Sequence, residues 1–505
     1  MLVSCYETDD KYEAGKEITV TGVESVYNKT ALVDVLHIEP QIATTDPDCD
    51  LEYEWKLWQD YTGASSVPKD LVVDTISHER ILDYLVVNKP QTYRVELKVT
   101  NNTTGQEAYA ITTLNVTNDF SKGFYVMKDM GNAADMDLHT ADGTAISNVI
   151  GKTQGAPMPG TPKSLGVYPK FSYDNKTTLK NEVTTTLNIT TTEGFWVIDI
   201  ADLSTACELE TMFYFPGEPS TPLFGSFVYY GAIYVSDKGI HYSPYDLVWG
   251  AGGGTGIFGS AIAIEKGYRL NINIASDRYY TYFFDELNGR FLTVNYNGML
   301  NACSDQDAGG NTPAVTPNNI DNKMLYFGRN KIGTTAVGFV VMQHPTDPTK
   351  RYLYEMTLNG LSTNPMLSKR EITGLNLNEA TLFANNELQS RVLYYATGSK
   401  VYRYLIDDQQ ENELTLTGFG TGEQITYLKN IYWTGASTDD GKFNYLAIGT
   451  QSGGNYKVYL YNLVAGVPTG SPVRVLTGEG KALKMHYITP EFTVDVGNYQ
   501  YPIGF

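Results

Sequence analysis

The chain has 505 residues, 42% of them hydrophobic, and a formal net charge of −20. This length exceeds that of one ordinary domain, so we expect roughly two to four domains with sizeable cores. The acidic balance argues against nucleic acid as a partner, because phosphate binding needs clustered Lys and Arg, and the sequence has no such cluster. No uninterrupted apolar run approaches the ~20 residues that a transmembrane helix needs. With 38 tyrosines and 47 glycines, the composition favours many short strands joined by tight turns.

The N-terminal residues carry a possible anchoring signal. An aliphatic, a β-branched and a small residue precede Cys5 in the run Leu2-Val-Ser-Cys, and an acidic stretch at 6–10 follows. The run resembles the lipobox cleaved by bacterial lipoprotein signal peptidase, in which the cysteine sulfur takes a diacylglycerol. The acidic stretch resembles the export signal of surface lipoproteins of Bacteroidota. These resemblances imply lipidation at Cys5 and localisation at the outer-membrane cell surface, with the lipid as the membrane contact. Residues 1–25 are expected to be this lipobox and a polar tether.

Residues 26–119 show the period-2 patterning of half-buried strands. Apolar and polar positions alternate through 53–58 and 93–99, and more weakly through 111–116. Turn signals separate these runs over roughly a hundred residues, which predicts an immunoglobulin-like sandwich. The run from Tyr93, its Gly105 turn and the closing run resemble the last strands of a PKD domain. Trp55 lies where that family places its core tryptophan. The family's usual Trp-Asp-Phe-Gly-Asp-Gly string is absent, so the resemblance is PKD-like.

Residues 120–505 almost lack helical periodicity, and one kind of aromatic strand returns seven times. Its recurrences begin near Phe124, Phe195, Ala232, Tyr280, Val337, Val392 and Leu446. A polar turn and a second aromatic strand follow most clearly across 394–405 and 448–461. The pattern predicts a β-propeller of about seven blades, closed by pairing a strand around 492–496 with the strand near Phe124. An array of β-sandwiches is the alternative. The predicted fold class is therefore all-β, a PKD-like sandwich followed by a propeller.

No string has the spacing of a known catalytic or metal site. HExxH and GxSxG are absent, and the six histidines lie far apart. The run 254–259 matches GxGxxG, but 270–274 then alternates like a strand, so we interpret the match as an inter-blade loop rather than a pyrophosphate site. Gly- and Asn-containing loops carry four aspartates: Asp137, Asp142, Asp305 and Asp307. Their spacing does not fit a calcium-binding EF-hand and favours solvated turns. We predict no catalytic residue, no metal site and no cofactor.

Tryptophans are the candidate contact residues. Trp55 and Trp196 lie in apolar alternation, which predicts core positions. Trp58, on the opposite face of its strand from Trp55, and Trp249, beside the glycine run, are candidate exposed platforms. Such a ring can stack on a sugar or a peptide side chain, or be buried in a protein interface.

Together, the lipobox, the acidic stretch, the PKD-like sandwich and the tyrosine-rich β region resemble the PKD-like family lipoproteins of Bacteroidota. The resemblance implies a non-catalytic subunit that helps a SusC-like TonB-dependent transporter and its SusD-like lipoprotein lid capture oligosaccharides or oligopeptides. Two alternatives stay open: a surface hydrolase with a glycosidase-type carboxylate pair, and a structural or adhesin subunit without a small ligand. A hydrolase should hold two close carboxylates with shifted pKa values, a binding module an open aromatic patch, and a structural subunit neither.

Overall fold

The computed structural model describes residues 17–489, with gaps at 46–47, 61–71, 176–179, 215–219, 246–255, 278, 333–334, 361–362, 375, 389, 419, 421 and 435–441. These residues form 38 strands, one α-helix, α1 (Val149–Gln154), and one 3-10 turn, η1 (Leu377–Glu379). The predicted all-β class is confirmed. Within this described part, no helix combines the length and apolarity needed to cross a membrane. The chain divides into two compact units, Met1–Asp119 and Phe120–Phe505.

The first unit consists of one five-stranded sheet and two strand pairs. The sheet has the order β2 (Val26–Thr30), β9 (Glu107–Thr117), β8 (Thr92–Asn101), β5 (Leu51–Gln59) and β6 (Asp74–Ser77). The pairs are β1 (Ile18–Thr21) with β4 (Gln41–Thr44), and β3 (Val35–Ile38) with β7 (Leu82–Leu85). Neighbouring strands run antiparallel except β2 and β9, which are parallel.

Alternation in the sequence explains the core of the first unit. Every second residue of β8 is buried, because strand side chains point alternately to opposite faces. Trp55 of β5 is fully buried, and its indole nitrogen donates to the carbonyl of Glu79 at 2.9 Å, so its predicted core position is confirmed. Two details differ from expectation. Strand β1 forms within the residues assigned to the tether, and Ile111 lies on the exposed face of β9.

The second unit, within its described residues, consists of seven small antiparallel sheets. The first contains β10 (Gly123–Asp129), β11 (Ala133–His139), β12 (Ala145–Ile146), β13 (Met158–Pro159) and β38 (Lys481–Ile488). The second contains β14 (Pro162–Asn175), β15 (Lys180–Thr191), β16 (Phe195–Asp199) and β17 (Thr205–Glu208). The third contains β18 (Pro222–Val228), β19 (Gly231–Ser236) and β20 (Gly239–Pro244).

The remaining four sheets continue in chain order. The fourth contains β21 (Ala275–Asp277), β22 (Tyr280–Asp285), β23 (Arg290–Asn295) and β24 (Leu300–Ala302). The fifth contains β25 (Lys323–Ile332), β26 (Thr335–Gln343), β27 (Arg351–Thr357) and β28 (Met366–Ile372). The sixth contains β29 (Leu382–Asn385), β30 (Val392–Thr397), β31 (Lys400–Leu405) and β32 (Gln410–Glu413). The seventh contains β33 (Gln424–Trp433), β34 (Phe443–Ser452), β35 (Asn455–Val464), β36 (Val467–Pro468) and β37 (Arg474–Glu479).

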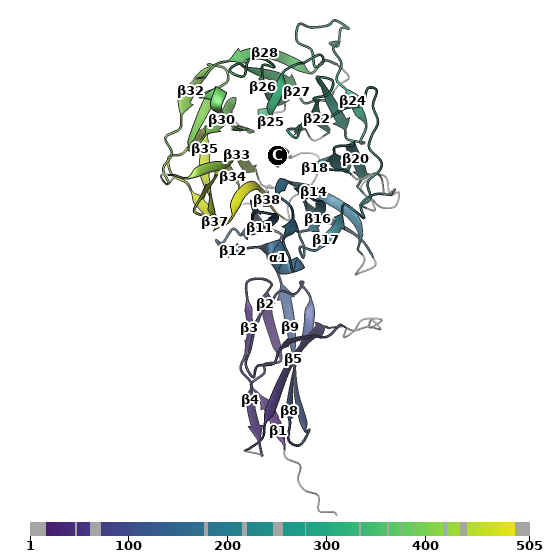
Figure 1. The fold of residues 1–505 in the computed structure, drawn as a ribbon, viewed down its shortest axis with the longest axis vertical. Helices are drawn as coiled ribbons and strands as arrows, with labels where there is room; N and C mark the ends of the chain where they lie inside the picture. The colour runs from purple at the N-terminus through teal and green to yellow at the C-terminus, as the bar shows by residue number, and fades with distance from the viewer. Residues whose placement is uncertain are drawn as a thin grey trace, which may run out of the picture. The chain divides into compact units, whose positions relative to one another are not determined.

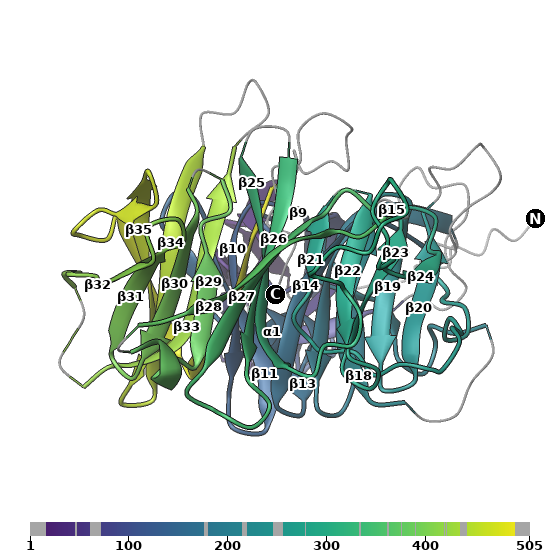
Figure 2. The ribbon, with the colours of Figure 1, turned by 90° about the horizontal axis from the view of Figure 1, so that it is seen from above.

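The sheets of the second unit lie around a common centre (Figure 1), with their strands standing side by side (Figure 2). Strands of neighbouring sheets contact one another in the series β14–β18, β18–β22, β21–β25, β25–β29, β29–β33, β33–β38 and β38–β14. Strand β38 pairs with β10, so the first sheet joins strands from distant parts of the chain. Apolar clusters fill the spaces between successive sheets from the third to the seventh.

The seven predicted strand recurrences fall on strands of seven different sheets: β10, β16, β19, β22, β26, β30 and β34. The two predicted aromatic hairpins are β30–β31 and β34–β35. The strand predicted at 270–274 does not form; Leu270 makes only an isolated bridge to Asp285. The strand predicted around 492–496 lies outside the described residues, and β38 is the strand that pairs with β10.

Candidate functional site

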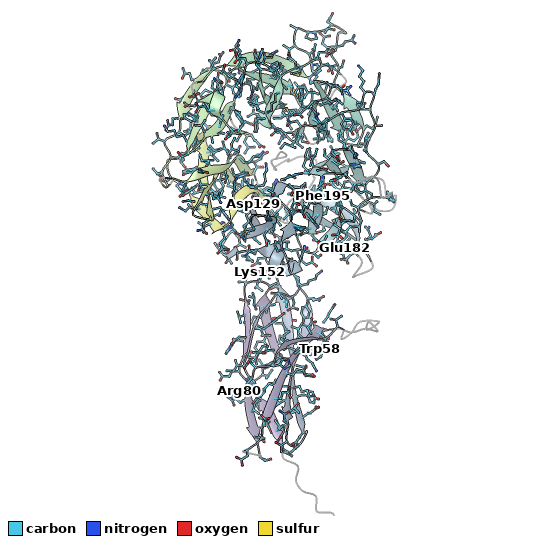
Figure 3. All side chains as sticks on the ribbon, viewed as in Figure 1. Trp58, Arg80, Asp129, Lys152, Glu182 and Phe195 are labelled. Carbon is cyan, nitrogen blue, oxygen red and sulfur yellow. The ribbon has the colours of Figure 1, made fainter. Side chains whose placement is uncertain are left out.

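The contact residues predicted from the sequence cannot all be placed. Cys5 and Trp249 lie outside the described residues. Trp58 is half-buried on β5 (Figure 3) and is paired across the sheet with Arg94 of β8. It stands on the face of β5 opposite Trp55, as the alternation requires. Trp196 departs from its predicted core position: it is half-buried, with its ring against the backbone of Gly194.

The four aspartates considered for calcium have separate structural roles. Asp142 and Asp307 accept backbone N–H groups within their own turns, as turn aspartates do. Asp305 accepts a hydrogen bond from Asn318 at 2.8 Å. The expectation of a solvated turn is wrong for Asp137, which is buried in β11. Among the residues that the structure describes, no group of three or more His, Cys, Asp or Glu side chains could hold a metal ion.

Five tyrosines gather at one end of the third and fourth sheets. We call them the tyrosine cluster: Tyr229, Tyr230, Tyr279, Tyr280 and Tyr296. They come from the β18–β19 turn, the start of β22 and the β23–β24 turn. Successive ring centroids lie 4.6 to 6.3 Å apart, within the range of attractive aromatic pairs. All five side chains are partly exposed, Tyr279 to 36%. The cluster therefore presents several aromatic rings to solvent.

Close backbone contacts fix the rings of this region. At Gly360, where φ is +63°, a Cβ atom would lie 2.1 Å from the ring of Tyr280. At Gly298, where φ is +79°, it would lie 2.6 Å from the ring of Tyr242. Tyr242 in turn donates a hydrogen bond to the carbonyl of Tyr230 at 2.9 Å. Glycine is thus required at both positions by its backbone angle and by the neighbouring ring.

The tyrosine cluster offers apolar faces and hydrogen-bonding groups at one place. Aromatic rings offer an apolar face, and the phenol oxygen both donates and accepts hydrogen bonds. Burial and the neighbouring Tyr296 raise the pKa of Tyr280, so its hydroxyl remains protonated at neutral pH. The exposed amides of Asn297 and Asn359 lie next to Tyr296 and Gly360 in the chain. These amides carry further hydrogen-bond donors and acceptors.

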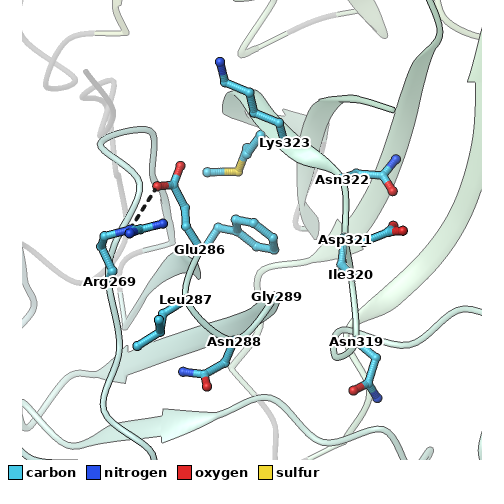
Figure 4. A pocket seen from close by; sticks show the side chains of 12 residues that line it. Arg269, Glu286, Leu287, Asn288, Gly289, Asn319, Ile320, Asp321, Asn322 and Lys323 are labelled. Atoms are coloured by element: carbon cyan, nitrogen blue, oxygen red, sulfur yellow. Dashed lines mark ion pairs between the residues drawn. The ribbon is translucent and has the colours of Figure 1, made fainter. Parts of the chain in front are cut away.

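A second candidate is an open pocket of about 660 Å³ beside the fourth and fifth sheets (Figure 4). The turn 286–289 between β22 and β23 lines one side, and the segment 319–324 leading into β25 lines the other. Arg269 and Glu286 form an ion pair across 3.7 Å at its edge. Because β22 spans roughly 17 Å between Tyr280 and Asp285, the pocket and the tyrosine cluster lie at opposite ends of one strand. One small ligand therefore cannot contact both.

Sequence reasoning missed the tyrosine cluster, although a signal was present. Tyrosine pairs stand at element boundaries at 229–230, just before β19, and at 279–280, at the start of β22. Side chains at such boundaries often remain partly exposed, because strand packing no longer covers them. The sequence does not reveal that the two pairs and Tyr296 meet.

Comparison with known proteins finds one family model that matches part of the chain. Residues 5–162 match the model of the PKD-like family. The PKD-like match extends beyond the predicted 26–119 at both ends and reaches the start of β14. No curated protein matches the chain.

Two solved structures from Bacteroides show a weak likeness. A quinonprotein alcohol dehydrogenase-like protein from Bacteroides thetaiotaomicron is 12% identical with a TM-score of 0.49, over 91% of this chain and 96% of that one. A DUF4784 family protein from Bacteroides caccae is 8% identical with a TM-score of 0.32, over 79% and 95%. Both TM-scores fall below 0.5, so neither structure indicates an activity for this chain.

Proposed function

We propose that this protein is a non-catalytic, lipid-anchored surface protein that captures an oligosaccharide for a SusC-like transporter and its SusD-like lid. The second unit would be a seven-bladed β-propeller that carries the binding surface. Two features support the propeller: the described sheets number seven, and β38 pairs with β10 across the whole unit. Pairing of this kind protects sheet edges that would otherwise be open to aggregation.

The tyrosine cluster is the observation that carries the binding function. Its rings are held close together and remain partly exposed, so several of them can contact one ligand. An oligosaccharide offers both C–H faces for stacking and hydroxyls for the phenols, so we favour it over an oligopeptide.

The transporter partnership rests on the resemblance at the N-terminus and on the PKD-like match. A lipid at Cys5 would confine the protein to the membrane that holds the transporter. Confinement raises the effective concentration of the partner, so that even a modest interface suffices for a complex.

Binding is tested by calorimetric titration of the full chain carrying Cys5→Ala with malto-, cello-, xylo- and manno-hexaoses. We expect Tyr279→Ala and Tyr296→Ala each to weaken binding about tenfold, or ~1.4 kcal/mol. Tyr109→Ala is the matched control, because Tyr109 is 52% exposed on the first unit. Equal affinity in all variants, or release of shortened sugars during titration, would contradict the proposal.

Assembly is tested separately, on the native lipidated protein. Gentle detergent extraction followed by affinity purification should recover the transporter and its lid together with this protein. Recovery of the protein alone from membranes in which all three are expressed would count against the partnership.

A further inference from the structure

The rings of the tyrosine cluster face different directions. Tyr296 contacts Tyr230 and Tyr280 edge to face, with ring centroids 5.7 and 6.3 Å apart and ring planes inclined by 77° and 78°. Tyr296 also contacts Tyr279, again at 77°. Tyr229 is inclined by 61° to Tyr230 and by 58° to Tyr279. In all five contacts, therefore, the two ring planes are steeply inclined to each other.

The spacing of the rings decides where a sugar can lie. Four of the contacts join the rings of residues 229, 230, 296 and 279 into a closed cycle, with steps of 4.6, 5.7, 6.0 and 5.4 Å between centroids. A sugar between two rings would need about 7–8 Å, because nonbonded carbon atoms touch at about 3.5–4.0 Å on each side. No step of the cycle is that long. A sugar must therefore stack on the sides of the rings that face solvent.

Contacts with the surrounding backbone keep the rings from turning into one plane. The ring of Tyr280 lies against Gly360, whose N–H donates to the hydroxyl of Tyr282 at 2.7 Å. Tyr282 is only 1% exposed, so this hydrogen bond fixes Gly360 to the core. The carbonyl of Tyr230 accepts hydrogen bonds from the Tyr242 hydroxyl and the Tyr245 N–H, both at 2.9 Å. The inclined arrangement is thus built into the folded unit.

Inclined rings distinguish between glycans of different shape. A sugar stacks on an aromatic ring with its C–H face parallel to the ring plane. In a flat β-1,4-linked glucan or mannan, the faces of successive sugars lie nearly in one plane. Such a chain can stack on one ring of the cluster but not also on its inclined neighbour. The backbones of α-1,4- and β-1,3-linked glucans curve, so the faces of successive sugars turn and can follow rings that are inclined to one another.

We propose that the tyrosine cluster selects glycans with a curved backbone, of the α-1,4- or β-1,3-linked glucan type, over flat β-1,4-linked chains. This inference rests on the proposed function, because it names the class of oligosaccharide that the same surface binds. A curved chain stacks on two or more rings at once, whereas a flat chain stacks on one. The additional aromatic contact should favour the curved chain about tenfold.

The test compares four hexaoses on the full chain carrying Cys5→Ala. Maltohexaose and laminarihexaose are the curved probes, and cellohexaose and mannohexaose are the flat ones. Calorimetric titration should show at least one curved hexaose binding about tenfold more tightly than both flat ones. This comparison uses wild-type rings and so does not depend on the folding of any ring variant.

Variants at one ring then connect the preference to the cluster. Tyr280→Ala removes a ring inclined by 78° to Tyr296, and should weaken binding of the curved hexaose more than binding of the flat ones. Tyr280→Phe keeps the ring and should keep the preference. Tyr109→Ala, on the first unit, is the control for an exposed tyrosine outside the cluster.

The outcomes separate this inference from the proposed function. Flat hexaoses that bind as tightly as the curved ones, with affinities that still depend on the cluster, would overturn the inference and leave oligosaccharide capture standing. An unchanged preference in Tyr280→Ala would overturn it as well. If none of the four hexaoses binds, both the inference and the proposed binding function fail.

Discussion

The buried ion pair of Lys128 and Asp137 offers a quantitative test of how the first and seventh sheets are held together. Their side chains are 1% and 2% exposed, and the ammonium and carboxylate lie 2.6 Å apart. Asp137 also accepts hydrogen bonds from the backbone N–H of Asn148 and from the hydroxyl of Tyr456, both at 2.8 Å. Since Tyr456 belongs to β35, this carboxylate connects two sheets.

Lys128→Met keeps the apolar stem and leaves the carboxylate buried without its cation. Removing one partner of a buried pair costs ~3–5 kcal/mol. Asp137 retains two donors, so we expect the lower end, a loss of about 3 kcal/mol in the free energy of unfolding. Lys128→Met combined with Asp137→Leu should recover part of this loss, because no unpaired charge then remains buried.

The assay is urea unfolding of the wild type, both single variants and the double variant, followed by circular dichroism and tryptophan fluorescence. From this double-mutant cycle we expect a coupling energy between Lys128 and Asp137 of about 2 kcal/mol or more. Strictly additive effects, or a loss below about 1 kcal/mol in Lys128→Met, would refute the reasoning. Calcium should not shift the urea unfolding midpoint of the wild type by binding at Asp137, because that carboxylate already interacts with protein donors.

Four further outcomes are expected. Trp55→Ala should cost ~3–5 kcal/mol in the first unit and leave the unfolding of the second unit unchanged, as two resolved calorimetric transitions would report. Gly360→Ala should displace the Tyr280 ring and weaken oligosaccharide binding, measured by calorimetry beside an unchanged circular dichroism spectrum. Burial lowers the pKa of His139 from 6.5 to about 4, so the unfolded chain binds a proton in this range that the folded protein excludes. Stability should therefore fall by up to about 3 kcal/mol as the pH drops through that window, and urea midpoints of His139→Gln should depend less on pH. Cys5→Ala should release the protein from membranes, as fractionation would detect.

Local patterns predicted the strands well where one physical constraint dominates. The alternation of apolar and polar residues predicted the buried face of β8, because a half-buried strand must place every second side chain in the core. The recurring aromatic strand located one member of each described sheet in the second unit, since each sheet packs on its neighbours in a similar way. The prediction failed at Trp196, whose ring is half-buried although the residues on either side of it in β16 are buried. Apolar neighbours in a strand therefore do not establish that a ring is buried.

The candidate sites could not be predicted in the same way, because each depends on contacts between distant segments. The tyrosine cluster combines turns that are some fifty residues apart in the chain. The sequence shows the tyrosine pairs, but it does not show that the β18–β19 and β23–β24 turns bring them together.

The pairing of β10 with β38 has a consequence for the biogenesis of the second unit. The paired residues Gly123 and Ile488 are 365 positions apart. Until the chain has been synthesised through Ile488, β10 lacks this partner and offers an open edge to other chains. The intervening sheets can begin to form earlier, but the first sheet can be completed only after β38 has been synthesised. If the chain is exported before it folds, this order would delay the step that locks the unit until Ile488 has been synthesised.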